Sequence, residues 1–213
     1  TISSISPTSF GESQLSSSQT ITITGGNFSS SVTVEIIGSD GTTYTPASTT
    51  RDSVSQITIT TPTTLTNANE NYKIKVTNSS GLSAELANAI SVNAAPVFST
   101  AAGSLGTLPD TNRAASNLTN ISFSDSDSSA TLSVTSGSIP PGLTLASDGT
   151  FSGTANAVAS NTTSTFTVTA TDGSESATRQ YSITVNAPVL LEYLGVAGGG
   201  GGGGQVGGGG GAG

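Results

Sequence analysis

Apolar and polar residues alternate in short bursts along the first part of the chain. The segment TITIT at 20–24 places Ile21 and Ile23 on one face, and SVTVEI at 31–36 repeats the pattern. A period of two is typical of strands that bury one face, and turn residues separate the bursts. On this basis we predict strands over residues 20–24, 31–36, 56–62, 71–77 and 89–92.

The same alternation returns in a second unit, after the short linker NAAP at 93–96. Within this unit, Pro140, Pro141 and Gly142 predict a rigid turn, and SDG at 147–149 predicts a hairpin turn. No long stretch of the chain has an apolar pattern of helical period. The predicted strands of the second unit cover residues 120–123, 131–134, 165–171 and 180–185.

The linkers predict how the chain is divided into domains. Each unit ends in a strand followed by a similar segment, NAAP at 93–96 and NAPV at 186–189. The residue before a proline favours extended backbone, as expected between domains. We therefore predict an all-β fold with two tandem β-sandwiches, residues 1–93 and 94–187, followed by a glycine-rich extended segment at 188–213.

The glycine-rich segment has almost no side chains. Of the nineteen residues from Gly195 to Gly213, fourteen are glycine. Ordering each residue costs roughly 1 to 2 kcal/mol of backbone entropy, and burial of side chains cannot offset that cost here. The segment is therefore a flexible tether, an assembly element whose backbone groups bond to neighbouring chains, or the start of a further domain.

We favour the assembly element, because the serine that usually solubilises a flexible tether is absent from 195–213. In an extended glycine helix every backbone group points sideways and can bond to an identical neighbour. The glycines assigned to assembly are Gly198, Gly199, Gly200, Gly201, Gly202, Gly203, Gly204, Gly207, Gly208, Gly209, Gly210 and Gly211.

Composition excludes several classes of function. The net charge of −8 repels phosphate, which argues against nucleic acid and anionic membranes as partners. The apolar run VLLEYLGVA at 189–197 is far shorter than the roughly 20 residues that span a bilayer. The chain has no histidine and no cysteine, so the usual catalytic triads and the imidazole and thiolate metal sites are excluded. We therefore expect no enzymatic activity.

Five stretches of the first unit carry a resemblance to a known family: ISPTSFGES at 5–13, TITITGGNF at 20–28, VTVEIIG at 32–38, ITITTP at 57–62 and YKIKVTNSSG at 72–81. Through them the first unit resembles the IPT/TIG family of immunoglobulin-like domains. The resemblance implies that the first sandwich is immunoglobulin-like.

Six stretches of the second unit carry a further resemblance: PVFSTAAGSLGTL at 96–108, FSDSDSSATLSV at 123–134, GSIPPGLTL at 137–145, DGTFSGTA at 148–155, STFTVTATDG at 164–173 and YSITVNAP at 181–188. Through them the second unit resembles the Putative Ig, cadherin-like repeats of bacterial and phage surface proteins. The segment LLEYLGVAGGGGGGG is also similar to glycine-rich parts of structural proteins from marine phages, cyanophages in particular.

The cadherin-like resemblance implies candidate calcium ligands. Asp125 and Asp127 in SDSDSS, with Asp172 in ATDGS and Asp110 in LPDTN, are the acidic residues concerned. Calcium takes about six to eight oxygen ligands, of which a pair of aspartates at one end of a sandwich can supply some. The fuller cadherin pattern of clustered acidic and asparagine residues is missing, so solvated aspartates in turns are the alternative. No other cofactor is expected.

The resemblances together imply a structural or adhesive component of a virion appendage, such as a tail fibre, located on the virion surface. Its expected partners are copies of itself, with a trimer implied by fibre proteins, other virion or filament proteins, and a glycan or protein on a host surface. A secreted adhesin or filament protein of the bacterial cell surface is the main alternative. A carbohydrate-binding module is disfavoured, because the chain has no tryptophan to stack on a sugar.

Overall fold

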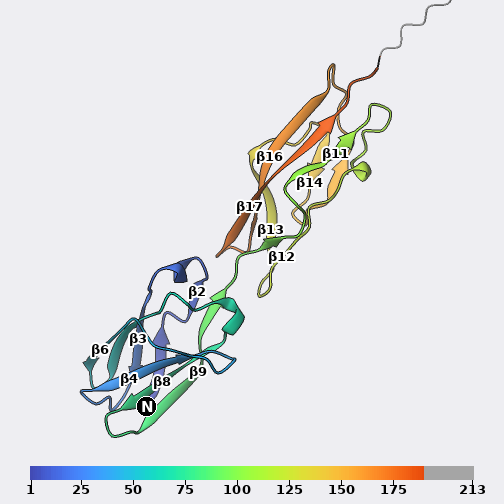
Figure 1. Cartoon of the computed structure of the whole chain (residues 1–213). Helices are drawn as coiled ribbons and strands as arrows, with labels where there is room; N and C mark the ends of the chain where they lie inside the picture. The colour runs from blue at the N-terminus through green and yellow to red at the C-terminus, as the bar shows by residue number, and fades with distance from the viewer. Residues whose placement is uncertain (190–213) are drawn as a thin grey trace, which may run out of the picture.

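The computed structural model describes residues 1–189. These residues form two all-β domains that lie end to end (Figure 1). The prediction of two tandem immunoglobulin-like sandwiches is confirmed. The predicted extended segment at 188–213, including every glycine assigned to assembly, lies outside the described residues except for Pro188 and Val189.

The first domain packs a four-stranded sheet, in the order β1-β3-β7-β6, against a five-stranded sheet, in the order β2-β9-β8-β4-β5. Within the five-stranded sheet β2 runs parallel to β9, and the other neighbours are antiparallel. Its strands are β1 (Ile2–Ser6), β2 (Ser9–Gly11), β3 (Thr20–Gly25), β4 (Val32–Ile37), β5 (Thr43–Tyr44), β6 (Ser48–Ser53), β7 (Gln56–Thr60), β8 (Tyr72–Asn78) and β9 (Ser83–Asn93). Two short 3₁₀ helices, η1 (Gln14–Ser16) and η2 (Asn67–Asn69), lie in its connections.

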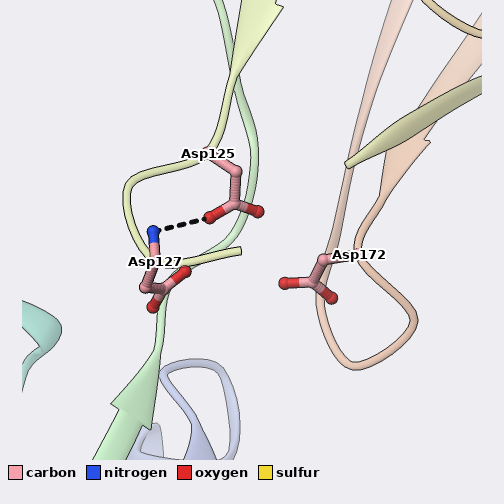
Figure 2. Close-up of side chains that lie close together, drawn as sticks. All are labelled: Asp125, Asp127 and Asp172. Carbon is pink, nitrogen blue, oxygen red and sulfur yellow. Dashed lines mark hydrogen bonds between the residues drawn. The ribbon is translucent and has the colours of Figure 1, made fainter. Parts of the chain in front are cut away.

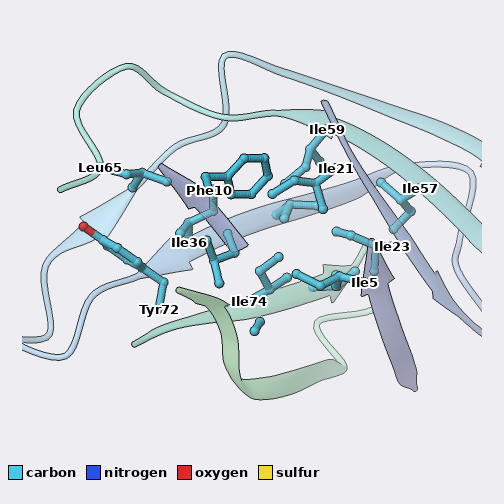
Figure 3. Close-up of a cluster of buried hydrophobic side chains, with 14 of the residues drawn as sticks. Ile5, Phe10, Ile21, Ile23, Ile36, Ile57, Ile59, Leu65, Tyr72 and Ile74 are labelled. Atoms are coloured by element: carbon cyan, nitrogen blue, oxygen red, sulfur yellow. The ribbon is translucent and has the colours of Figure 1, made fainter. Parts of the chain in front are cut away.

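Isoleucine is the most frequent residue in the core between these two sheets (Figure 3). In the register of β3 and β7, Ile21 lies opposite Ile59 and Ile23 lies opposite Ile57, and none of the four is exposed. Alternate residues of an antiparallel pair point to the same face, so the period of two read from the sequence places them all inward. Tyr72 enters the same core from β8 (Figure 3).

The second domain is built around a four-stranded sheet in the order β11-β17-β16-β13, with β11 parallel to β17. Two short antiparallel pairs, β10 with β12 and β14 with β15, complete the sandwich. Its strands are β10 (Val97–Phe98), β11 (Gly103–Leu108), β12 (Phe123–Ser124), β13 (Thr131–Gly137), β14 (Leu143–Leu145), β15 (Phe151–Gly153), β16 (Thr162–Thr171) and β17 (Ser176–Val185), and η3 (Ala115–Asn117) is a 3₁₀ helix.

Aromatic rings pack against one another in the core of the second domain. Phe166 from β16 and Tyr181 from β17 are fully buried, with ring centroids 6.4 Å apart. The predicted hairpin turn at SDG is confirmed, since β14 pairs with β15 and Gly149 has a φ of +88°. Phe151 follows that turn and is buried in the core.

Threonine and serine cover the outward face of the large sheet in this domain. Along β16 every second residue from Thr163 to Thr171 is threonine, and each lies opposite a polar residue of β17. Their hydroxyl groups bond across the strands, as between Thr163 and Thr184 at 2.9 Å. Cross-strand threonine pairs stabilise a sheet, which accounts for part of the high hydroxyl content of the chain.

Candidate functional site

Three of the four predicted calcium ligands come together at the end of the second domain that faces the first. One carboxylate oxygen from each of Asp125, Asp127 and Asp172 can be chosen so that all three oxygens lie within 4.8 Å of one another. Asp125 and Asp127 lie on the loop after β12, and Asp172 faces them from the turn between β16 and β17 (Figure 2). We refer to these three residues as the acidic cluster.

Hydrogen bonds to backbone amides shape both loops of the acidic cluster. The Oδ1 atom of Asp125 accepts from the amides of Asp127, at 3.2 Å, and Ser128, at 3.3 Å (Figure 2). The Oδ1 atom of Asp172 accepts from the amides of Ser174, at 2.6 Å, and Glu175, at 2.7 Å. Aspartate bonds to its own following backbone in this way in turns, so each loop is organised by its own carboxylate.

The three carboxyl groups differ in pKa for identifiable reasons. The backbone hydrogen bond from Glu175, partly opposed by desolvation, lowers the pKa of Asp172 from 3.8 to about 2. Burial raises the pKa of Asp127, and the neighbouring Asp125 raises it further. Burial acts on Asp125 in the same direction, but hydrogen bonds with Asp127 and Ser128 outweigh it and lower the pKa. The acidic cluster therefore concentrates negative charge at neutral pH.

The donor set fits a hard divalent cation such as calcium. All the charged atoms of the acidic cluster are carboxylate oxygens, the ligand type that calcium prefers. The Oδ2 atom of Asp125 is buried and has no hydrogen-bond partner in the described part of the chain. A buried polar atom without a partner is costly, and a bound cation would relieve that cost. Asp125, Asp127 and Asp172 are the residues that would hold the ion.

Asp110, the fourth predicted ligand, does not join the acidic cluster. Its Oδ1 atom lies 2.7 Å from Nη1 of Arg113, with which it forms a salt bridge. The Nε atom of Arg113 also donates to the backbone oxygen of Ala155 at 3.0 Å. Asp110 therefore helps to hold a loop of the second domain, and sequence position alone did not reveal this partner.

The acidic cluster also binds the first domain directly. The Oδ2 atom of Asp127 accepts from Nδ2 of Asn67 and from the amide of Ala94, both at 2.8 Å. The Oδ2 atom of Asp172 accepts from Nδ2 of Asn93 at 2.6 Å. The candidate site is thus the junction between the domains, with donors from the first domain and the linker.

The sequence did not identify these donors. Asn67 lies 60 residues before Asp127, and Asn93 lies 79 residues before Asp172. The linker motif NAAP does contain Asn93 and Ala94, so its asparagine was the one signal that could have pointed to the site. Glu70 is a further acidic residue on this side, and its Oε2 atom accepts from the amide of Val92 at 2.9 Å.

Comparison with protein families agrees with the two sandwiches. Residues 1–93 match the family described as "IPT/TIG domain", and residues 95–186 match the family described as "Putative Ig domain". The chain therefore carries an IPT/TIG domain followed by a Putative Ig domain. Domains of these kinds are typical of adhesive or structural proteins outside the cell. No curated protein sequence matches the chain.

Solved structures with a similar fold include fragments of protocadherin, titin and N-cadherin. The protocadherin GammaB4 extracellular domain has a TM-score of 0.48 and 16% identity, with 88% of this chain and 33% of that chain covered. The I-band fragment I67-I69 of titin has a TM-score of 0.47 and 15% identity, with coverages of 83% and 62%. Drosophila N-cadherin EC1-4 has a TM-score of 0.43 and 13% identity, with coverages of 84% and 47%. The chain thus spans between one third and less than two thirds of these structures.

Proposed function

We propose that the chain is a non-enzymatic structural and adhesive spacer in an appendage of a particle or cell surface. The observation that carries this proposal is the junction, where side chains of the second domain bond to the first domain and the linker. Two sandwiches fixed end to end hold whatever lies beyond them at a defined distance. A spacer requires that property, whereas a catalyst does not.

The absence of catalytic chemistry supports the same proposal. The chain contains no histidine or cysteine, and the carboxylates of the acidic cluster already accept hydrogen bonds from amides. A general base near neutral pH needs a pKa in that range, whereas the pKa of Asp172 is about 2.

Within residues 1–189, no helix has the length and apolar character of a membrane span.

We assign the spacer in particular to a virion appendage such as a tail or head fibre. This assignment is supported by the resemblance of the modules and of LLEYLGVAGGGGGGG to structural proteins of marine phages. A secreted bacterial adhesin or filament protein uses the same modules and is the alternative. Immunoelectron microscopy with antibodies to the full chain tests the two: labelling of intact particles supports the virion, and labelling confined to the surface of the producing cell contradicts it.

Self-association is the second part of the proposed function. The glycine-rich segment is proposed to join copies of the chain into a symmetric oligomer, with three chains as in fibre proteins. Light scattering of the full chain and of a chain truncated after Ala187 tests this. A trimer for the full chain and a monomer for the truncated chain are expected, and a monomer in both samples would contradict the proposal.

A further inference from the structure

Glu175 is a buried acidic residue at the junction that the acidic cluster does not use. It is only 8% exposed, although it lies in the turn between β16 and β17 at the end of the second domain. Its side chain enters the surface of the first domain beside Gly11, the last residue of β2. Burial of a carboxylate is costly unless hydrogen bonds compensate it, so its partners matter.

Ser13 supplies those partners. The Oε1 atom of Glu175 accepts from Oγ of Ser13 at 2.5 Å and from the amide of Ser13 at 3.3 Å. These two residues are 162 positions apart in the sequence, so the contact exists only when both domains are folded and docked. Hydrogen bonds to a charged acceptor are roughly twice as strong as those between neutral groups.

Gly11 leaves the space that Glu175 occupies. A Cβ atom added at Gly11 would overlap the carboxylate of Glu175. The backbone of Gly11 is outside the left-handed region, so glycine matters here for the space that it leaves to the Glu175 carboxylate and not for its conformation. Gln14 holds the same loop, because its Oε1 atom accepts from the amide of Gly11 at 2.9 Å. The first domain therefore presents a shaped receptor for one side chain.

Asp172 holds the turn that carries Glu175 in the second domain. Its Oδ1 atom accepts from the amides of Ser174 and Glu175, which fixes the turn that carries the glutamate. Its Oδ2 atom accepts from Asn93 in the linker. The donors of this arrangement are all protein groups, so it requires no cation.

We propose that Gly11, Ser13 and Glu175 form a latch that fixes the angle between the two domains without a bound metal ion. Domains joined by a short linker move relative to one another by default unless their interface prevents it. The latch supplies a specific contact of that kind. The purpose of the latch rests on the proposed spacer function, since a spacer needs a fixed angle. The contacts that form the latch are independent of that function.

Distance measurement between the domains tests the latch. The chain has no native cysteine, so Thr64→Cys and Thr178→Cys place one spin label on an exposed position of each domain. In the full chain with a chelator present, electron double resonance should give one narrow distance distribution. Gly11→Ala should shift this distribution or broaden it by about two-fold or more, because the glutamate loses its place.

Matched variants separate the latch from general damage. Gly26→Ala is the control, since a Cβ there meets only an ordinary van der Waals contact with Thr1, and its distribution should stay narrow. Glu175→Gln keeps an oxygen that accepts from Ser13 and should also stay narrow. Ser13→Ala removes the hydroxyl donor without adding atoms and should broaden the distribution even if Gly11→Ala folds poorly.

Two results would overturn the latch. One is a broad distribution for the parent protein in the presence of chelator, which would mean that the angle is not fixed without metal. The other is a narrow, unchanged distribution in both Gly11→Ala and Ser13→Ala. The first result would also count against the proposed spacer, which needs a fixed junction. The second result would leave the junction fixed by its other contacts, such as Asp127 with Asn67, so it would overturn the latch alone. Neither result bears on whether the chain labels virions or forms oligomers.

Discussion

Isoleucine is the most frequent residue in the interior of the first domain, whereas the second domain packs aromatic rings against one another. Ile21, Ile23, Ile57 and Ile59 stack between the sheets of the first domain. In the second, Phe166 lies between Phe151 and Tyr181, with ring centroids 6.4 Å from each. One architecture thus accepts two kinds of packing, because both place bulky apolar residues at alternate positions of paired strands. The two interiors should respond differently to the loss of one side chain.

The largest expected effect is on the aromatic interior. Phe166→Ala removes a ring that is 1% exposed and contacts two other rings, so we expect a loss of about 3 to 5 kcal/mol in the free energy of unfolding. Urea unfolding measures the loss, and hydrogen exchange locates it in the second domain.

The first domain provides the comparison for that experiment. Ile57→Ala removes a smaller side chain that is completely buried, and we expect a loss of about 2 to 5 kcal/mol confined to residues 1–93. If either substitution accelerated exchange equally in both domains, the two cores would form one cooperative unit and the comparison would fail.

Each domain buries a tyrosine whose hydroxyl is hydrogen-bonded, and removing that hydroxyl should cost less unfolding free energy than the core substitutions above. The hydroxyl of Tyr72 donates to the carbonyl of Thr66 at 2.8 Å and accepts from its amide at 2.9 Å. In Tyr72→Phe the carbonyl of Thr66 keeps the amide of Asn69, at 3.3 Å, but the amide of Thr66 loses its partner. We therefore expect a loss of about 1 to 3 kcal/mol in the free energy of unfolding.

Tyr181→Phe should cost less. The hydroxyl of Tyr181 donates to the carbonyl of Thr100, but Nη1 of Arg179 also donates to that oxygen at 2.7 Å. The carbonyl therefore keeps a partner in the variant. Thermal unfolding of both variants checks this order, and a larger loss for Tyr181→Phe than for Tyr72→Phe would contradict it.

The next prediction concerns calcium binding at the junction between the domains, and not the domain interiors. We expect calcium to stabilise the folded full chain by about 1.4 kcal/mol when the free ion is tenfold above its dissociation constant. The melting temperature of the full chain should rise accordingly. Asp125→Asn should abolish the effect, and Asp110→Asn, a matched change outside the acidic cluster, should keep it. An absence of both binding heat and melting shift in the parent protein would exclude the calcium site.

The sequence predicted the interiors far better than the junction. Strict alternation identified β3, β4, β7, β8, β16 and β17, because each of these strands buries one face. It did not identify β6 or β11. The six residues of β6 include none that is buried, and β11 carries glycines at two backbone positions with positive φ. Edge strands of these kinds leave no periodic apolar signal.

Different physics hides the junction from sequence patterns. Its contacts join single residues that are 33 to 162 positions apart, and no periodicity links one such residue to another. The candidate aspartates could be chosen from the cadherin-like resemblance, and three of the four lie in one cluster. The latch residues had no comparable signal, since Gly11 and Glu175 have meaning only as a pair.

The smallest expected effect is the pH dependence of the junction. Asp172 has a pKa of about 2 in the folded protein against an ordinary value of 3.8, so its ionised form stabilises the fold. This contribution is complete above about pH 4 and is lost as the pH falls through about 2. Asp172→Asn should therefore lower the melting temperature near neutral pH, and the gap from the parent should close toward pH 2.

The stability change of Asp127→Asn should depend on pH in the opposite direction to that of Asp172→Asn, so the two variants together test the junction. Burial and Asp125 raise the pKa of Asp127, so its ionised form is disfavoured in the folded protein. Relative to the parent, Asp127→Asn should gain stability as the pH rises through that raised pKa, because the variant never acquires the charge. Melting curves of both variants between pH 2 and 7 measure the two trends. If the two variants showed the same trend with pH, the junction would not form the hydrogen bonds that give Asp172 and Asp127 different pKa values.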